Sequence, residues 1–306
     1  MGTPALAAHI LERLATADVS KYLVVGVVTR PDQPRGRKLV MEPSEVGATA
    51  ARLGIPVLKP TKIRTPEFLV DLRAFEPDLI VVAAYGRILP QSILDAPRIM
   101  PMNVHASLLP RHRGASPIEG AILAGDTDSG VTIMRVVEKM DAGPMILKRS
   151  IPIAPNDTQG TLKEKLAELG AGALLEALDQ LIDGTLIETA QDENLATFTG
   201  IIEKKDAAID WNRSAAQIER GVRAHDPWPV ARTRFAADEL MIWRARIADE
   251  SASGQAGTIV SIKPEVVVQC GRGRLALLEV QAPGRKRISA LDWARGKRLE
   301  IGALFQ

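Results

Sequence analysis

Asn103 and His105 stand where polar side chains often meet a ligand. They lie two residues apart at the end of an apolar run, just before a loop broken by proline and glycine. Residues two apart on a strand project to the same face, and ligands of open α/β sheets bind beyond the carboxyl ends of the strands. Asp141 follows a later apolar run, shortly before Gly143. Taken singly, Asp141 could be a turn-forming residue and His105 a structural histidine.

The first two-thirds of the chain alternates short β-branched runs with helical patterns, which is typical of a parallel sheet covered by helices. We expect strands at residues 22–28, 79–84, 101–105, 131–137 and 145–153. We expect helices at residues 6–15, 44–53, 65–74, 116–124 and 159–181. The predicted fold class is therefore α/β, with a Rossmann-like, mostly parallel sheet that carries helices on both faces.

The start of the chain does not fit this pattern. A sheet of this type usually opens with a central strand, whereas here Gly2-Thr3-Pro4 leads directly into the first expected helix. Either that strand is missing from this sequence or the sheet closes without it.

The last third has a different pattern after Asp206. One helical stretch at residues 214–222 precedes five short strand patterns, separated by Gly, Pro and charged turns. These expected strands are residues 231–235, 241–247, 257–262, 265–270 and 275–281. The spacing predicts a small antiparallel barrel, and an OB-like barrel is favoured. We expect a catalytic domain at 1–190, a linker at 191–206 and a C-terminal domain at 207–306.

Charge is unevenly divided along the 306 residues. Residues 207–306 hold 16 Lys and Arg against 11 Asp and Glu, which gives +5, whereas the whole chain is only +2. A basic module beside a slightly acidic one indicates either a polyanionic partner or a solvated surface.

Composition excludes several other classes of protein. No apolar run approaches the roughly 20 residues that cross a bilayer, and no secretory signal is visible, so we expect a cytoplasmic protein without a membrane partner. Cys270 is the single cysteine, and the four histidines lack ligand spacing, so we expect neither a disulfide nor a metal.

The motifs together resemble the signature of the folate-dependent formyltransferases. That signature is carried by Asn103-x-His105-x-Ser107-Leu108-Leu109-Pro110, by Arg-x-Arg-Gly-Ala-x-Pro at residues 111–117, and by Asp141-x-Gly143. Further similarity to the tRNA-directed members of this family lies at residues 30–34, 84–90, 131–134, 207–211, 226–229 and 299–305. The resemblance thus covers nearly the whole chain.

The resemblance implies a reaction in which an amine attacks the formyl carbon of 10-formyltetrahydrofolate. Asn103 and His105 would donate hydrogen bonds to the oxygen that becomes negative. Asp141 would relay the proton lost by the amine, directly or through water, or would hold His105 in its charged form. These three residues are the catalytic set that we expect.

The resemblance also implies the residues that contact the folate. Ser107, Leu108, Leu109 and Pro110 would lie along the cofactor, and Tyr85, Gly86 and Ile88 would surround its pterin. The alternative for Leu108 and Leu109 is that they are ordinary core residues.

The tRNA-directed members imply methionyl initiator tRNA as the acceptor of the formyl group. We expect the protein to bind this tRNA as a monomer. Arg35, Arg37 and Lys38 lie in a polar loop that resembles the family's tRNA-contacting insertion, although an ordinary solvated loop is the alternative. In the C-terminal domain, Arg244, Arg285 and Lys286 are candidate phosphate contacts. A sugar-nucleotide formyltransferase and a non-enzymatic tRNA-binding protein are the competing hypotheses.

Overall fold

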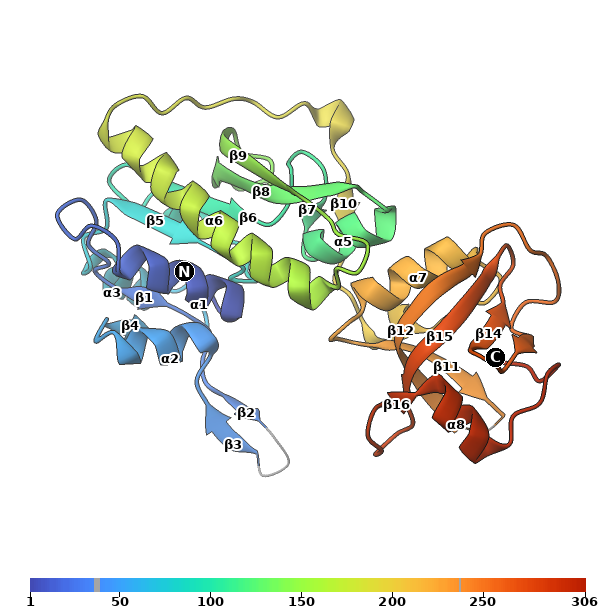
Figure 1. Ribbon diagram of the computed structural model, residues 1–306. Coiled ribbons are helices and arrows are strands. Elements are labelled where there is room, and N and C mark those ends of the chain that lie inside the picture. Colours follow the sequence, from blue (N-terminus) through green and yellow to red (C-terminus); the bar gives the residue numbers. More distant parts are fainter. Residues whose placement is uncertain (36–38, 237) are drawn as a thin grey trace. The chain divides into compact units, whose positions relative to one another are not determined.

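The computed structural model of the chain describes residues 1–35, 39–236 and 238–306, which divide into two compact units (Figure 1). The first unit comprises Met1–Pro117, Asp128–Pro152 and Lys163–Gly200. The second comprises Ile118–Thr127, Ile153–Leu162 and Ile201–Gln306. Each unit has its own hydrophobic core.

A four-stranded sheet in the order β5-β6-β8-β9 forms the centre of the first unit. Its strands are β5 (Leu79–Val82), β6 (Met100–His105), β8 (Asp128–Arg135) and β9 (Met145–Pro152). Strands β5 and β6 are parallel, as expected, but β8 runs antiparallel to both β6 and β9. The prediction of a mostly parallel sheet is therefore wrong for this half. Residues 136–144 are fewer than the dozen or so that a parallel crossover from β8 to β9 would need.

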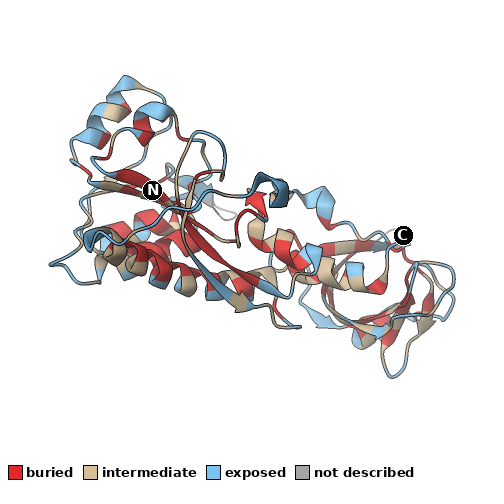
Figure 2. Cartoon of the chain, turned by 90° about the horizontal axis from the view of Figure 1, so that it is seen from above, coloured by how far each residue is buried: buried red, intermediate tan, exposed pale blue. Residues whose placement is uncertain are grey.

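Helices cover both faces of this sheet, as predicted. On one face, Gly170 of α6 (Gln159–Ile182) lies against Val104, Val131 and Ile10 of α1 (Ala5–Ala15). On the other, Ile80 and Val82 pack with α3 (Pro66–Arg73) and α4 (Gln91–Leu94). Figure 2 shows the buried residues concentrated in the strands between these helices.

The remaining elements of the first unit are short. Strand β1 (Val27–Val28) pairs in parallel with β4 (Val57–Leu58), and β2 (Gln33–Arg35) pairs antiparallel with β3 (Val40–Glu42). Helix α2 (Glu45–Arg52) begins after Ser44, whose side chain accepts the Gly47 amide hydrogen, as a helix cap does. Strand β7 (Arg113–Gly114) pairs in parallel with β10 (Phe198–Thr199). A 3-10 turn, Glu193–Leu195, precedes β10.

Residues 1 and 2 lie between β1 and β5 and link the two sheets. The Gly2 amide donates to the Val28 carbonyl at 3.1 Å, and the Ala83 amide donates to the Met1 carbonyl at 2.9 Å. A parallel bridge joins Gly2 to Ala83. The expected strand at residues 22–28 is regular only at Val27–Val28, where β4 supplies a partner.

The second unit contains the antiparallel sheet that the sequence predicted, in the order β11-β12-β15-β14-β13, with β16 paired to β15. The strands are β11 (Ala231–Phe235), β12 (Asp238–Asp249), β13 (Ile259–Ser261), β14 (Val266–Gln269), β15 (Arg274–Gln281) and β16 (Ile288–Ser289). The helices are α5 (Pro117–Ala124), the 3-10 turn Lys204–Ala207, α7 (Ala215–Ala224) and α8 (Ala290–Lys297). Strand β16 and helix α8 were not predicted.

Aromatic side chains tie the end of the chain to the core of the second unit. The Phe305 ring stacks on Trp211 and Trp293 at centroid distances of 5.5 and 6.0 Å. The rings of Phe305 and Phe235 meet in an edge-to-face arrangement with their centroids 5.6 Å apart, and only 4% of Phe305 is exposed. Cys270 is also buried in this core, as expected, and burial raises the pKa of its thiol to about 11.

We expect Phe305→Ala to lower the free energy of unfolding of the second unit by about 3–5 kcal/mol, because it leaves a cavity among three aromatic rings. Urea unfolding followed by tryptophan fluorescence measures the change. Ile301→Ala is the matched control, since Ile301 is 69% exposed and should change stability by no more than about 0.5 kcal/mol. Equal effects of the two substitutions would contradict the proposed anchoring.

Candidate active site

His105 and Asp141 lie side by side in the first unit. Oδ2 of Asp141 is 3.7 Å from Nδ1 of His105, and both side chains are largely buried, with 16% and 6% exposed. Asn103 lies two residues before His105 on β6, between Val82 of β5 and Met134 of β8. The side-chain amide of Asn103 makes no hydrogen bond among the described residues. The structure thus brings Asp141 to His105, and Asn103 lies two residues from His105 on the same strand.

Each nitrogen of the His105 imidazole has a polar neighbour. Nε2 is 3.0 Å from the His112 carbonyl oxygen, and Nδ1 faces the Asp141 carboxylate. Because a carbonyl only accepts, Nε2 must carry a hydrogen in this arrangement. The 3.7 Å separation to Asp141 is an ion-pair distance rather than a direct hydrogen bond.

Asp141 reaches His105 from an unexpected direction. Since β8 is antiparallel to β6, its last residue, Arg135, lies opposite Met102, whereas His105 pairs with Thr132. The loop after β8 must therefore fold back toward His105. Gly143 permits this, because a Cβ there would lie 1.9 Å from the Arg135 carbonyl oxygen.

The carboxylate of Asp141 is fixed by the loop on the other side of the site. Its Oδ2 accepts a hydrogen bond of 2.8 Å from the Gly114 amide. Gly114 has φ +113, and a Cβ on it would lie 2.2 Å from the Thr199 carbonyl oxygen. Only glycine therefore suits this position.

Three residues that sequence reasoning did not assign hold these loops together. Nε2 of Gln191 donates to the carbonyl oxygens of Asp141 and Gly143, each at 2.8 Å. The fully buried Arg113 donates to Oε1 of Gln191 and to the carboxylate of Glu193. Arg113 lies within the signature motif, but no local pattern marks Gln191 or Glu193.

Glu193 neutralises the buried guanidinium. The hydrogen bonds from Arg113, and then from Lys139, lower the pKa of the Glu193 carboxyl to about 2. The ion pair with Arg113 has an N···O distance of 2.9 Å. A buried cation needs such a partner. The ion pair and the hydrogen bonds therefore tie the Gln191–Glu193 segment to Arg113.

The segment expected to lie along the folate is anchored by Thr132. Its Oγ1 accepts from the Leu109 amide at 3.1 Å and donates to the Ser107 carbonyl at 2.7 Å. The Leu109 side chain is 1% exposed and belongs to the core, Pro110 is also buried, and Leu108 is half-buried. Ser107 is likewise buried, and its hydroxyl donates to the Arg111 carbonyl.

The expected pterin loop follows β5. Because β5 and β6 are parallel, this loop and the loop after His105 leave the sheet at the same edge. Tyr85 is 2% exposed and packs in the core, whereas Gly86 is exposed and Ile88 is 62% exposed. Gly86 and Ile88, rather than the Tyr85 ring, are therefore open to a ligand.

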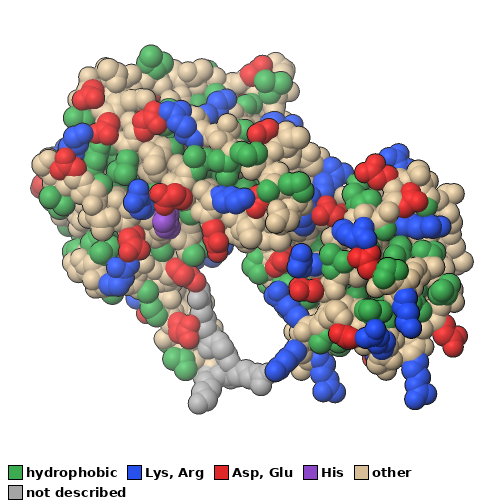
Figure 3. Space-filling model, in the orientation of Figure 1, with side chains coloured by type: hydrophobic (Ala, Val, Ile, Leu, Met, Phe, Trp, Pro, Cys, Tyr) green, Lys and Arg blue, Asp and Glu red, His purple; other side chains and the backbone are tan. Residues whose placement is uncertain are grey.

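The candidate tRNA contacts differ in their surroundings. Arg244, Arg285 and Lys286 are exposed in the second unit, and none has an acidic partner within ion-pair distance in the described part of the chain. Figure 3 shows Lys and Arg side chains on the surface of this unit. By contrast, Arg246 pairs with Glu265. Arg35 lies in β2 with its side chain undescribed, and Arg37 and Lys38 lie outside the described residues.

Neither a metal cluster nor a membrane span is found within the described ranges. No group of three or more His, Cys, Asp or Glu side chains there could hold a metal ion. No helix in those ranges is long and apolar enough to cross a bilayer.

Two family models match this chain. The formyl transferase model matches residues 1–178, and the formyl transferase C-terminal domain model matches residues 201–298. The chain belongs to the formyl transferase family. A protein named methionyl-tRNA formyltransferase from Methylococcus capsulatus is 45% identical to this formyltransferase over 303 residues, which cover 97% of each chain.

Solved structures share the fold of this formyltransferase at low identity. An N-formyltransferase from Helicobacter canadensis, in complex with folinic acid and dTDP-3-aminofucose, is 17% identical, with a TM-score of 0.65 over 92% of this chain and 97% of that one. HypX from Aquifex aeolicus, in complex with tetrahydrofolic acid, is 18% identical, with a TM-score of 0.61. The match covers 91% of this chain and 48% of HypX, so the formyltransferase spans about half of that protein.

We expect Gln191→Glu to lower the turnover of formyl transfer by up to about 10²-fold, because a small displacement of Asp141 has an effect of that size. A carboxylate keeps an acceptor for Arg113 but cannot donate to the carbonyls of Asp141 and Gly143. Steady-state kinetics should show a fall in kcat with little change in KM. The control is Asn194→Ala, on the same segment. Full turnover in the Gln191 variant would show that the segment does not position Asp141.

Proposed function

We propose that this formyltransferase moves the formyl group of 10-formyltetrahydrofolate to the α-amino group of methionyl initiator tRNA. Residues 1–190 would carry the catalytic site, and residues 207–306 would form an OB-like tRNA-binding domain after a linker at 191–206. The 45% identity to a named methionyl-tRNA formyltransferase along almost the full length of both chains supports this acceptor. The sugar-directed N-formyltransferase is 17% identical, which supports a shared fold alone.

The observation that carries the proposal is the approach of Asp141 to His105 at 3.7 Å. Asn103 lies two residues earlier on β6, and its side-chain amide makes no hydrogen bond among the described residues. Bound formyl folate supplies a carbonyl carbon for attack by the amine. The side-chain amide of Asn103 can donate to the carbonyl oxygen as negative charge develops. His105 could donate as well only if one of its N–H groups turns to the substrate, because Nε2 is bound to the His112 carbonyl and Nδ1 faces Asp141. Asp141 can accept the proton released by the attacking nitrogen, directly or through water.

The loops after β5 and β6 fit a folate. Gly86 offers exposed backbone and Ile88 an exposed apolar side chain at the edge of the sheet shared with His105. A flat heteroaromatic ring suits such a surface, because its edge hydrogen-bonds to backbone groups while its face contacts apolar side chains. Ser107, Leu108, Leu109 and Pro110 would continue the contact through backbone atoms, since the side chains of all but Leu108 are buried.

The exposed cations of the second unit suit a phosphate backbone. Arg244, Arg285 and Lys286 have no acidic partner within ion-pair distance among the described residues, so each is available to a phosphate. Arg35, Arg37 and Lys38 complete the set of contacts that we propose. A sugar-nucleotide acceptor would not require these cations.

The acceptor and the catalytic set can be tested in one assay. We expect formyl-methionyl-tRNA when the protein is incubated with 10-formyltetrahydrofolate and methionyl initiator tRNA, and no formylated product from an amino-sugar nucleotide. Asn103→Ala, His105→Ala and Asp141→Asn should each lower kcat by about 10²–10³-fold, because each removes a donor or the proton acceptor. Circular dichroism checks that the variants remain folded. A formylated sugar, or near-normal turnover in the Asp141 variant, would overturn the proposal.

Removal of unpaired charge should weaken tRNA binding in a salt-dependent way. Binding of tRNA should weaken as salt is added, and the slope of the logarithm of its association constant against the logarithm of the salt concentration is negative. We expect the double variant Arg285→Ala, Lys286→Ala to make this slope shallower by about 2, because each phosphate contact contributes about 1. Filter binding at several salt concentrations measures the slope. Arg246→Ala is the control, since Glu265 already neutralises that arginine. An unchanged slope in the double variant would place the tRNA elsewhere.

A further inference from the structure

Arg30 joins two parts of the first unit that the proposed function assigns to different substrates. It lies between β1 and β2, and its Nη2 donates a hydrogen bond of 2.7 Å to the Gly86 carbonyl oxygen. Gly86 belongs to the loop after β5, where the folate is proposed to bind, and Arg35 of β2 is a proposed tRNA contact. One side chain thus connects the start of β2 to the folate loop.

The guanidinium of Arg30 lies directly against the Gly86 backbone. A Cβ on residue 86 would be 2.5 Å from Nη2 and 3.4 Å from Cζ of Arg30, and Gly86 has φ +71. Both the space and the backbone conformation therefore favour glycine. Arg30 is exposed and has no acidic partner within ion-pair distance among the described residues. The Gly86 carbonyl is therefore the polar group that holds this guanidinium.

A second arginine makes the return link from the folate loop. Nη1 of Arg87 donates to the Pro60 carbonyl oxygen at 3.1 Å. Lys59, the residue before Pro60, pairs through Nζ with Oδ1 of Asp32 at 2.6 Å. Since Asp32 lies directly before β2, these contacts form a closed ring from the start of β2 to the folate loop and back.

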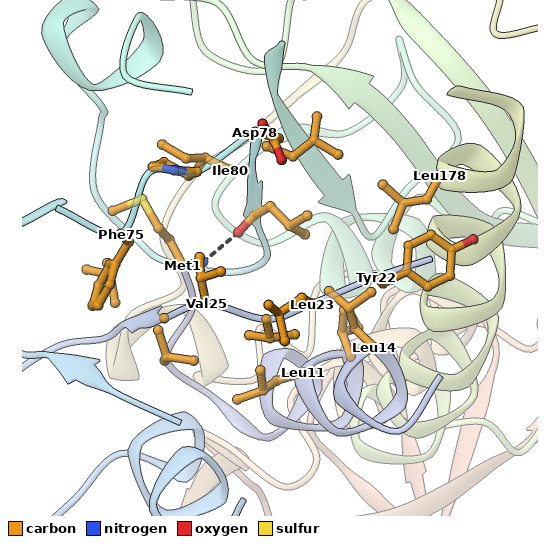
Figure 4. Close-up of a pocket in the computed structure, with 18 of the residues that line it drawn as sticks. Met1, Leu11, Leu14, Tyr22, Leu23, Val25, Phe75, Asp78, Ile80 and Leu178 are labelled. Carbon is orange, nitrogen blue, oxygen red and sulfur yellow. Dashed lines mark hydrogen bonds between the residues drawn. The ribbon is translucent and has the colours of Figure 1, made fainter. Parts of the chain in front are cut away.

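The chain that leads to Arg30 becomes fixed just before it. Leu23 and Val25 border the cavity around Met1 and are exposed (Figure 4). Thr29, by contrast, is fully buried, and its hydroxyl lies 2.6 Å from Oγ of Ser44, which follows β3. The Arg30 side chain therefore extends from a fixed point that is shared with the end of β3.

We propose that Arg30 is a positioning residue that couples the two substrate sites, so that folate and tRNA each strengthen the binding of the other. The inference rests on the proposed function, which places the folate at Gly86 and the tRNA at Arg35. A folate bound to the loop after β5 would fix the Gly86 carbonyl, and with it the Arg30 side chain and the start of β2. The tRNA would then meet a β2–β3 pair that is already held in place, and binding to such a segment loses less conformational entropy.

The coupling can be measured as a ratio of dissociation constants. Filter binding gives the Kd of methionyl initiator tRNA with and without saturating tetrahydrofolate, which has no formyl group to transfer. We expect tetrahydrofolate to lower this Kd by about five-fold or more in the unsubstituted chain. In Arg30→Met the ratio of the two Kd values should fall to about 1, because methionine cannot donate to the Gly86 carbonyl. A ratio that is unchanged in Arg30→Met, or already about 1 in the unsubstituted chain, would overturn the proposal.

Two further variants separate the position of the guanidinium from its charge. Loss of a cation that only attracts tRNA lowers the affinity equally with and without folate, and so leaves the ratio unchanged. Arg30→Lys should keep part of the ratio, since an ammonium group can still donate to a carbonyl. Arg98→Met is the matched control and should keep the full ratio, because Arg98 is exposed and pairs with Glu76 and Asp78 outside the ring of contacts. Equal loss of the ratio in Arg98→Met would show that Arg30 has no specific part in the coupling.

Failure of the coupling and failure of the proposed function give different results. A chain that forms formyl-methionyl-tRNA, but whose tRNA affinity does not respond to tetrahydrofolate, would retain the proposed function and lose the coupling. A chain that forms no formyl-methionyl-tRNA would lose both.

Discussion

The return of the Asp141 loop to His105 is the constraint on which the site depends. Strand β8 runs antiparallel to β6 and carries the chain away from His105 before the loop turns back. Four contacts fix the loop after the turn: the close packing of Gly143 on Arg135, the hydrogen bond from the Gly114 amide, and two hydrogen bonds from Gln191. These contacts hold the Asp141 carboxylate in place although it lies in a loop.

The buried Arg113 extends this constraint to the segment after β9. Its guanidinium holds Gln191 and Glu193, and its backbone pairs with β10. Breaking such a pair would leave an uncompensated buried charge, which is far more costly than losing a surface ion pair. The His105 imidazole, the Asp141 carboxylate and the amide of Gln191 therefore belong to one network that joins β6, the loop after β8 and the segment Gln191–Glu193.

The second unit contributes charge and stability of its own. Its aromatic core closes over Phe305 at the end of the chain. Its exposed arginines divide into those with acidic partners, such as Arg246, and those without, such as Arg244. The ion pair of Arg246 depends on strand register, because Glu265 lies beside Arg246 only once β14 and β12 have both paired with β15.

The sequence by itself determined the alternation of strands and helices, the antiparallel strands of the last third, and the placement of Asn103 and His105 on one strand face. These depend on local periodicity, which short stretches of chain carry. Asp141 was found only because the whole motif resembled a family. Tertiary structure alone decided the direction of β8, the burial of Tyr85 and Leu109, and the role of Gln191, because pairing direction and long-range hydrogen bonds join residues that share no local pattern. It also decided that the run at residues 22–28 is a strand only where β4 pairs with it, since a strand needs a neighbour as well as a suitable composition.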